Sequence, residues 1–313
     1  MKICMLDAGS IGRDLDLSVF GTCGEFVFFW QTLPGEIEER IADAEVVLVN
    51  KVRLDRTRLA AAGKLRLICI AATGYDNIDV AYCRERGIAV CNVAGYSTQS
   101  VAQLTFAMAL QLVNHLPEYT EYVRCGAYSA GTAANRLEPT YHELGGSTWG
   151  IVGYGNIGRQ VAQIARSFGC RVLINRQHNS EDCVPLDTLC RESDVISLHV
   201  PLTDRTRGLI DRNLIASMKR NAILINVARG AVCDEEALVE AVAQKRIGGI
   251  GVDVYTSEPL AADHPYMRIA GLPNVCLTPH MAWGAYEARV RCVNEMVANI
   301  RAFCAGERRN RVD

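Results

Sequence analysis

Residues 148–176 read TWGIVGYGNIGRQVAQIARSFGCRVLINR: a short apolar run, three spaced glycines, an amphipathic stretch and a second apolar run. The glycines, Gly153, Gly155 and Gly158, have G-x-G-x-x-G spacing. After a strand, the first glycine permits a tight turn, the second lets backbone amides approach a pyrophosphate, and the third lets the helix lie close to the strand. The segment therefore predicts a βαβ unit that binds a dinucleotide at the N-terminus of its helix.

The stretch after the glycines has the periodicity of an amphipathic helix. Apolar side chains recur at helical spacing, at Ile157, Val161, Ile164, Ala165 and Phe168. Gly169 is suited to end this helix, because glycine readily adopts the left-handed conformation that follows many helices. A turn without a ligand is the alternative, but the strand before and the helix after the glycines favour a dinucleotide.

The acidic residue that normally follows such glycines by about 20 positions is missing. That position holds Asn175, followed by Arg176 and, nearby, His178. A carboxylate binds the adenosine ribose hydroxyls and repels a 2′-phosphate, whereas neutral and cationic donors accept it. The sequence thus favours NADP(H) over NAD(H). In the alternative interpretation, Arg176 is an ordinary surface charge and Asn175 binds an unphosphorylated ribose.

The composition is that of a globular protein. The 313 residues suggest about two domains, and 49% hydrophobic residues are sufficient for large cores. The net charge is −2 and the charges are interspersed, which argues against nucleic acid or an anionic membrane as a partner. We expect a cytoplasmic protein, since MKICMLDAGSIG lacks the apolar core of a signal peptide and no stretch approaches the roughly 18 apolar residues of a membrane span.

The chain contains 13 cysteines. Most lie in apolar runs, as Cys4, Cys69 and Cys170 do, where a thiol behaves as a small hydrophobic group. There is no C-x-x-C pair and no cluster of cysteine and histidine at zinc spacing. The pattern predicts buried, reduced thiols and no metal site.

Apolar runs alternate with polar, periodic stretches along the chain. In the N-terminal third the runs occupy residues 2–7, 45–50, 65–72 and 88–93. From residue 146 onward they occupy residues 148–152, 171–175, 195–200, 222–227, 249–254 and 275–280. Helical stretches lie between them, for example at 78–87. This alternation predicts parallel sheets that are covered by helices on both faces.

Two long helices complete the pattern. Residues 97–116, STQSVAQLTFAMALQLVNHL, predict a very apolar helix that Ser97 or Thr98 can cap. We expect this helix where two domains or two subunits meet. A last amphipathic helix follows Ala285. The chain is therefore interpreted as two α/β units of unequal size, with the second inserted between the first unit and its C-terminal helix.

Three consecutive acidic residues precede another predicted helix. Asp234 can cap its N-terminus, and Glu235 and Glu236 add negative charge to its first turn, which the helix dipole favours. We predict that this helix extends to about Gln244.

Unusual polar residues follow three of the predicted strands. Arg229 follows INVA, Asp253 and Glu258 follow GIGV, and His280 follows VCLTP. Open parallel sheets bind ligands at the carboxyl ends of their strands, so we expect these side chains at a functional site.

These residues lie in motifs that resemble the D-isomer-specific 2-hydroxyacid dehydrogenase family. The motifs follow the family's order and are AATGYDNID (71–79), NVAGYSTQSVAQ (92–103), GYGNIG (153–158), HVPLTDRTRGLI (199–210), INVARGAVCDEEAL (225–238), GVDVYTSEP (251–259) and TPHMAWGA (278–285). Within the family, NKVRL at 50–54 and TPHMAWGA are most similar to the glycerate dehydrogenase and hydroxypyruvate reductase branch.

The resemblance implies two doubly wound α/β domains with parallel sheets. A flavodoxin-like substrate domain would comprise residues 1–98 and 285–313, and a Rossmann cofactor domain would comprise residues 99–284. The resemblance also implies a homodimer.

The implied reaction is the reversible reduction of a small 2-oxo acid by NAD(P)H, with hydroxypyruvate or glyoxylate favoured. His280 would donate the proton, because imidazole exchanges protons near neutral pH. Glu258 would stabilise the imidazolium, and Arg229 would hold the substrate carboxylate and polarise the carbonyl. Each has a structural alternative: a strand-end cap for Arg229, an exposed turn for Glu258 and a core histidine for His280. His199 is the rival histidine, which we expect beside the cofactor.

Further contacts are implied by the resemblance alone. For the cofactor they are Asn156 and Ile157 at the pyrophosphate, Asn175, Arg176 and Thr206 toward the adenosine ribose, Val227, Ala228 and Asp253 toward the nicotinamide, and Val200 and Pro201. For the substrate they are Lys51, Val52, Thr73, Gly74 and Trp283. Lys51 could equally be a solvated charge, and Trp283 a packing residue.

Two other functions use the same scaffold. The pocket could accept formate, phosphite or a bulkier 2-oxo acid, because fold alone does not set the substrate. The chain could also be a nucleotide-sensing, corepressor-like binding protein. The presence of Arg229, Glu258 and His280 favours an enzyme over that alternative.

Overall fold

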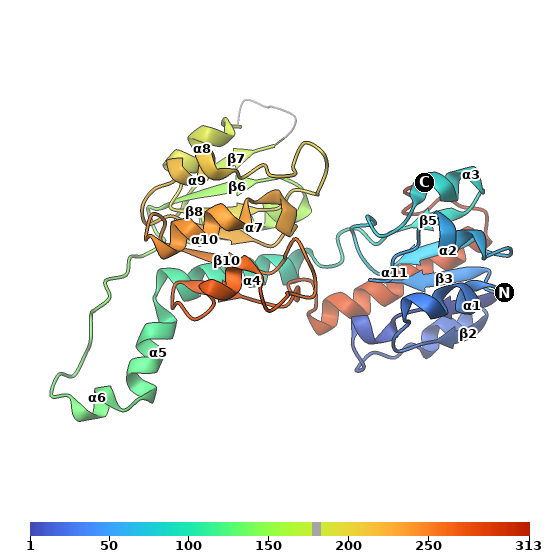
Figure 1. The fold of residues 1–313 in the computed structure, drawn as a ribbon, viewed down its shortest axis with the longest axis horizontal. Helices are drawn as coiled ribbons and strands as arrows, with labels where there is room; N and C mark the ends of the chain where they lie inside the picture. Colours follow the sequence, from blue (N-terminus) through green and yellow to red (C-terminus); the bar gives the residue numbers. More distant parts are fainter. Residues whose placement is uncertain (177–182) are drawn as a thin grey trace. The chain divides into compact units, whose positions relative to one another are not determined.

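The computed structural model describes residues 1–176 and 183–313. The described chain forms two compact units (Figure 1). Unit 1 comprises Met1–Ser97 and Gly284–Asp313, and unit 2 comprises Thr98–Trp283. Unit 2 is thus a continuous segment inserted into the sequence of unit 1.

Unit 1 contains a five-stranded sheet in which all pairs are parallel, in the order β2-β1-β3-β4-β5. Its strands are β1 (Lys2–Met5), β2 (Glu25–Phe28), β3 (Val46–Val49), β4 (Leu67–Ile70) and β5 (Ala89–Cys91). This is the flavodoxin-like strand order.

Fully apolar central strands explain why unit 1 needs helices on both faces of its sheet. β3 reads VVLV and β4 reads LICI, and all their residues are buried. The helices are α1 (Ile37–Ile41), α2 (Arg56–Ala60), α3 (Val80–Glu85) and α11 (Tyr286–Cys304), with 3-10 turns η1 (Ala8–Ile11), η2 (Ser18–Thr22) and η3 (Pro34–Glu36). The sequence pattern did not predict β2, which is an edge strand and largely exposed.

Unit 2 contains a six-stranded parallel sheet in the order β11-β10-β9-β8-β6-β7. Its strands are β6 (Thr148–Val152), β7 (Arg171–Asn175), β8 (Val195–Leu198), β9 (Ile223–Asn226), β10 (Gly249–Val252) and β11 (Val275–Leu277). The strand order reverses between β6 and β8, and such a switch point is where doubly wound sheets bind ligands. The predicted fold class is therefore confirmed for both units.

Helices cover both faces of this sheet. One face, with Trp149 and Ile151, packs against α4 (Thr98–Val113) and α7 (Asn156–Ser167). The opposite face, with Val152 and Leu198, packs against the remaining core helices. These are α8 (Leu186–Glu192), α9 (Arg212–Ser217) and α10 (Glu235–Ala243). The short turns are η4 (Gly230–Val232) and η5 (Pro265–Arg268).

The apolar character of α4 has a cause within unit 2. Its Phe106 ring lies 4.4 Å from the ring of Trp149, and the helix contacts α7, β9 and β10. The helix ends before the predicted residue 116, because His115 adopts a left-handed conformation with φ +51°. Figure 1 shows α5 (Leu116–Arg124) and α6 (Ala127–Ala130) extending away from the sheet of unit 2.

Most strands are shorter than the predicted apolar runs. In unit 2, β8, β10 and β11 each end before a polar residue that the run included, namely His199, Asp253 and His280. These residues therefore lie in loops at the carboxyl edge of the sheet. Among the described helices of both units, none has the length and apolarity that a membrane crossing requires.

Candidate active site

The three spaced glycines of unit 2 differ in what surrounds them. A Cβ at Gly153 would lie 2.7 Å from the carbonyl carbon of His199, and one at Gly158 would lie 2.0 Å from the carbonyl oxygen of Gly153. A Cβ at Gly155, the N-cap of α7, would have no described atom within 4 Å. Packing thus requires glycine at positions 153 and 158, whereas Gly155 leaves open space at the N-terminus of α7.

That open space fits the pyrophosphate of a dinucleotide. The first amides of α7, which belong to Asn156, Ile157 and Gly158, point along the helix axis without acceptors inside the helix. Backbone amides and the positive end of the helix dipole together attract a phosphate. These residues could therefore hold the dinucleotide that the sequence predicts.

Asn175 ends β7 beside this turn. Its carbonyl oxygen accepts a hydrogen bond from the amide of Gly153 at 2.8 Å, and its side-chain amide donates to the carbonyl oxygen of Val184 at 3.0 Å. Within the described residues, Nε of Arg176 is buried and has no hydrogen-bond partner. His178 lies outside the described residues.

The loop after β8 also lies against the glycine turn. The Val200 side chain would be 2.8 Å from a Cβ at Gly153. The Thr206 hydroxyl donates to the carbonyl oxygen of Pro201 at 2.6 Å and accepts from the amide of Thr203 at 2.8 Å. Thr206 therefore closes this turn.

His199 is unsuited to donate a proton near neutral pH. Its Nε2 lies 2.9 Å from Oγ of Ser197, and burial lowers the pKa of His199 to about 3. The ring is therefore neutral under ordinary conditions. This observation separates His199 from its rival, His280.

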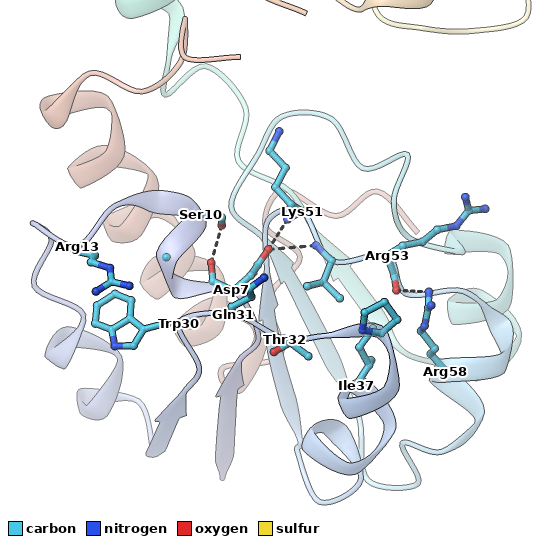
Figure 2. Close-up of a pocket in the computed structure, with 13 residues that line it drawn as sticks. Asp7, Ser10, Arg13, Trp30, Gln31, Thr32, Ile37, Lys51, Arg53 and Arg58 are labelled. Atoms are coloured by element: carbon cyan, nitrogen blue, oxygen red, sulfur yellow. Dashed lines mark hydrogen bonds between the residues drawn. The ribbon is translucent and has the colours of Figure 1, made fainter. Parts of the chain in front are cut away.

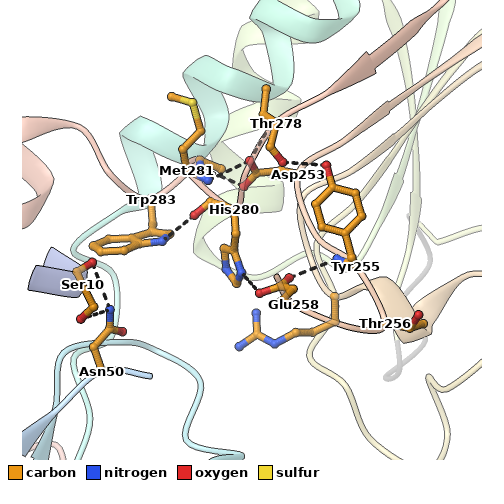
Figure 3. Close-up of polar contacts among 12 residues, drawn as sticks. Ser10, Asn50, Asp253, Tyr255, Thr256, Glu258, Thr278, His280, Met281 and Trp283 are labelled. Carbon is orange, nitrogen blue, oxygen red and sulfur yellow. Dashed lines mark hydrogen bonds and ion pairs between the residues drawn. The ribbon is translucent and has the colours of Figure 1, made fainter. Parts of the chain in front are cut away.

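His280 and Glu258 form a close pair. Nδ1 of His280 lies 2.6 Å from Oε2 of Glu258, and the side chains are 21% and 31% exposed (Figure 3). The other glutamate oxygen, Oε1, accepts from the amide of Tyr255 at 3.1 Å. The carboxylate is thus held by a turn of its own loop while it orients the imidazole ring.

The loop that carries His280 is fixed by Asp253. This carboxylate is fully buried and accepts from the amides of Met281 at 2.8 Å and Ala282 at 2.9 Å, and from the Thr278 hydroxyl at 2.5 Å (Figure 3). Burial raises the pKa of Asp253 above its ordinary value. Sequence reasoning assigned Asp253 to the cofactor and did not predict these contacts.

His280 itself has a left-handed backbone with φ +51°, and the Trp283 indole N–H donates to its carbonyl oxygen at 3.0 Å. A reversal of the chain at this point turns the loop back over the strand end. Trp283, predicted as a pocket wall, therefore also stabilises the backbone at His280.

Arg229 lies at the end of β9, against the loop of Glu258. The preceding turn is held by Asn226, which is fully buried: its amide donates to the Arg229 carbonyl at 2.9 Å, and its oxygen accepts from the Ala228 amide at 3.0 Å. A Cβ at Gly230 would lie 2.0 Å from the carbonyl carbon of Tyr255. The fold thus brings the loops of all three predicted catalytic residues to one edge of the sheet.

Sequence reasoning missed Asn226, although a signal was present. It is a polar residue near the end of an apolar run, AILINV, and its side chain holds the turn that includes Val227 and Ala228 and also contacts Sγ of Cys233 at 3.6 Å. An asparagine at that point satisfies buried backbone groups that no strand neighbour reaches.

The predicted substrate contacts Lys51 and Val52 lie in unit 1, where they line a cavity of about 620 Å³ (Figure 2). The Asp7 carboxylate holds this loop by accepting from the amides of Asn50 at 2.9 Å, Lys51 at 2.5 Å and Val52 at 3.2 Å. From the other side, the Asn77 amide donates to the carbonyl oxygens of Asn50 and Val52. Burial raises the pKa of Asp7 despite these donors.

Thr73 and Gly74, the other predicted substrate contacts of unit 1, follow β4. The Thr73 hydroxyl donates to the carbonyl oxygen of Val93 at 2.9 Å. Its side chain therefore fixes the loop, which leaves the backbone as the predicted contact to a carboxylate.

Residues 106–282 match the NAD binding domain of the D-isomer specific 2-hydroxyacid dehydrogenases. A glycerate dehydrogenase of Methylorubrum extorquens is 36% identical over 313 residues, which cover 100% of this chain and 99% of the relative. The protein therefore belongs to the D-isomer specific 2-hydroxyacid dehydrogenase family, as its motifs predicted.

Two further proteins are similar along nearly the whole chain. A hydroxypyruvate reductase of Blautia hydrogenotrophica is 34% identical over 317 residues, which cover 98% of this chain and 98% of the relative. Among solved structures, an acyclic imino acid reductase in complex with NADPH and D-Arg has a TM-score of 0.89 and 31% identity, with both chains covered completely.

Proposed function

We propose that the protein reduces hydroxypyruvate or glyoxylate to the D-2-hydroxy acid with NAD(P)H. The observation that carries this proposal is the contact of 2.6 Å between Nδ1 of His280 and Oε2 of Glu258, on a unit that matches an NAD binding domain. The glycerate dehydrogenase and the hydroxypyruvate reductase that are similar over the full chain support the choice of substrate.

The chemistry requires one hydride and one proton. A nicotinamide dinucleotide held by the glycine turn and the first turn of α7 would supply the hydride, so that the site must stabilise negative charge on the carbonyl oxygen of the substrate. His280 gives its Nε2 proton to this oxygen, and Glu258 stabilises the imidazolium that exists before the transfer. Arg229 binds the carboxylate and polarises the carbonyl through its planar set of donors.

For the cofactor, the proposal assigns the phosphates to the glycine turn and the first turn of α7. The nicotinamide side is assigned to Val227, Ala228 and Asp253, and the ribose side to Val200, Pro201, Thr206, Asn175 and Arg176. We propose a preference for NADP(H). It is supported by the absence of an acidic residue at Asn175 and by the buried Nε of Arg176, which lacks a partner within the described residues.

For the substrate, the proposal assigns binding to residues 1–98 and 285–313, and cofactor binding to residues 99–284. The substrate contacts are the backbone at Thr73 and Gly74, the loop at Lys51 and Val52, and Trp283. The predictions of a homodimer and of a cytoplasmic location are part of the same proposal.

A second candidate is the reduction of an imino acid. The acyclic imino acid reductase with a TM-score of 0.89 favours this candidate. The same donors of hydride and proton would serve an imine, but the reaction would need an amine together with the 2-oxo acid.

A cofactor and substrate screen tests the proposal. Oxidation of NADPH and NADH is followed with hydroxypyruvate, glyoxylate, pyruvate and phenylpyruvate, each with and without an amine, and NAD(P)⁺ reduction is followed with formate and phosphite. We expect the highest kcat/KM for hydroxypyruvate or glyoxylate without amine, and a D product. Turnover that depends on the amine would favour the second candidate, and turnover of formate or phosphite alone would contradict both.

A further inference from the structure

Glu235, the first residue of α10, differs from its neighbour in where its side chain lies. Only 8% of Glu235 is exposed, whereas the Glu236 side chain is 46% exposed and pairs with Arg268 at 2.5 Å. An acidic side chain is seldom buried unless it has specific partners. The sequence interpretation, negative charge in a first helical turn, does not explain this burial.

The partners of Glu235 lie in the loop that follows β10. Its Oε1 accepts from the Thr256 amide at 3.0 Å, and its Oε2 accepts from the Thr256 hydroxyl at 2.6 Å. Nε2 of His264 lies 3.1 Å from Oε2. Nδ1 of His264 accepts from the Tyr266 amide at 3.3 Å, so the ring is held in place beside the carboxylate.

Thr256 connects Glu235 and His264 to the pair formed by His280 and Glu258. It follows Tyr255, whose amide donates to Oε1 of Glu258 and whose hydroxyl donates to the Thr278 carbonyl at 2.8 Å (Figure 3). From the other side, a Cβ at Gly230 would lie 2.2 Å from the Thr256 nitrogen, so the backbone of the Arg229 loop packs directly on this turn.

We propose that Glu235, supported by His264, is a positioning residue that fixes the turn at Thr256 and thereby holds Glu258 against His280. The proposal rests on the proposed role of His280 as proton donor. The ionisable groups around Glu235 in unit 2 are His264, which precedes η5, Tyr266 from η5, Tyr255 from the β10 loop, and Cys233 and Asp234 before α10. Of these, only His264 lies within ion-pair distance of the Glu235 carboxylate in the described structure.

The geometry has a consequence for catalysis that differs from a general loss of stability. A carboxylate held at hydrogen-bond distance favours the protonated ring, and the reduction requires that form. If the turn loosens, Glu258 stabilises the imidazolium less, so the rate should begin to fall at a lower pH. A displacement of about 1 Å at a catalytic group can cost up to roughly 10²-fold in rate.

Two variants test the link. Glu235→Gln keeps one acceptor oxygen for the Thr256 amide but removes the negative charge and replaces the second oxygen with an N–H₂ group. Thr256→Val removes only the hydroxyl contact while its amide remains. Glu236→Gln is the matched control, since it makes the same change at the next, exposed residue. For each holoenzyme we would measure kcat, the KM of cofactor and substrate, the pH profile and the thermal unfolding midpoint.

We expect Glu235→Gln to lower kcat about tenfold or more, with little change in the cofactor KM. The alkaline limb of its pH profile for kcat should move to lower pH. Thr256→Val should shift that limb less, in the same direction, and Glu236→Gln should match the wild type. In a Glu258→Gln background, Glu235→Gln should not move the limb further, because residues that act through one another are not additive. An unchanged limb in both variants, even with a lower unfolding midpoint, would overturn the proposal, as would additive shifts.

A readout without turnover separates this inference from the proposed function. The Nδ1 proton of His280, bonded to Glu258, should give a downfield proton NMR signal that disappears in His280→Gln. We expect the signal to be lost or shifted in Glu235→Gln and kept in Glu236→Gln. A protein that shows these changes but reduces no 2-oxo acid would refute the proposed function alone, whereas an unaltered signal in Glu235→Gln would refute the positioning role alone.

Discussion

Oε2 of Glu258 lies 2.6 Å from Nδ1 of His280, while Oε1 of the same carboxylate accepts from the amide of Tyr255 at 3.1 Å. The glutamate cannot turn away from the ring without losing both contacts. The same two loops are also joined by three hydrogen bonds from the His280 loop to the buried Asp253 and by the Tyr255 hydroxyl, which donates to the Thr278 carbonyl. Several hydrogen bonds thus hold the two strand-end loops together, and the proposed reaction depends on the one between Glu258 and His280.

Removing the imidazole should affect the reaction and spare the cofactor. We expect His280→Ala to lower kcat by about 10² to 10⁴, the usual contribution of a general acid, with the cofactor dissociation constant nearly unchanged. Steady-state kinetics and fluorescence titration with NAD(P)H measure the two quantities. His142→Ala, at an exposed histidine, is the control. Near wild-type kcat in His280→Ala, together with lost activity in His199→Ala, would show that the acid is assigned to the wrong histidine.

A positive charge at position 229 should not be sufficient for full activity on 2-oxo acids. We expect Arg229→Lys to reduce kcat/KM for every accepted 2-oxo acid, because an ammonium group lacks the planar pair of donors that a carboxylate requires. Arg220→Lys, at an exposed position of the same unit, should leave kcat/KM unchanged. If the Arg229→Lys kinetics equal those of the wild type, Arg229 does not bind the substrate.

Cofactor preference should respond to Asn175 and Arg176. We expect the wild type to prefer NADPH, and Asn175→Asp with Arg176→Ala to shift the ratio of kcat/KM values toward NADH by roughly tenfold or more, since a charged hydrogen bond contributes about 1.5 to 3 kcal/mol. Arg176→Ala alone is informative, because Asn175→Asp also replaces the donor to the Val184 carbonyl. A wild type that strongly prefers NADH, with unchanged NADPH use in the double variant, would place both residues outside the discrimination of the 2′-phosphate.

Alanine substitutions at two glycines of the cofactor turn should affect cofactor binding and folding stability separately. We expect Gly155→Ala to fold normally, since no described atom lies within 4 Å of the added Cβ, and to bind cofactor at least about tenfold more weakly, since that methyl group occupies the proposed phosphate space. Gly158→Ala should instead lose stability, by about 1–3 kcal/mol, because its Cβ would lie 2.0 Å from the Gly153 carbonyl oxygen. Thermal unfolding and cofactor titration test both. Equal cofactor affinity in Gly155→Ala and wild type would argue against a pyrophosphate at this turn.

An ion pair in unit 1 should make stability depend on pH. The side-chain contact with Arg289 lowers the pKa of Asp14 from 3.8 to about 2. Because the folded-state pKa is depressed, the stabilisation is complete above pH 3.8 and is lost as the pH falls through about 2. We expect Asp14→Asn to lower the urea unfolding midpoint at pH 7 and to differ less from the wild type at pH 3.

The control for this prediction is Asp43→Asn, which removes an exposed carboxylate whose contact with Lys64 is longer, at 3.3 Å. We expect a smaller change in the midpoint there, since both side chains of that pair are exposed and such pairs contribute little, whereas the Arg289 side chain is only 14% exposed. A difference between Asp14→Asn and wild type that is the same at both pH values would contradict the role of the charge.

Periodicity located most strands, with limits that have a physical cause. β6 has the predicted bounds, because a strand buried on both faces is a continuous apolar run. β7 also has the predicted bounds, although it is an edge strand whose Arg171 is exposed. β2 was missed, since an edge strand with exposed side chains lacks that signal. The runs at β10 and β11 were predicted too long because Asp253 and His280 follow apolar residues but leave the sheet.

The sequence by itself determined the family, the parallel sheets, the glycine turn and the identity of the candidate catalytic residues, because these follow from local spacing and motif context. Only the tertiary structure decided that Asp253 holds the His280 loop and that Glu235 faces Thr256 and His264 instead of solvent. Such contacts join residues that are far apart in the chain. Whether a carboxylate is buried and partnered depends on which strand ends the sheet brings together, and no local pattern specifies that.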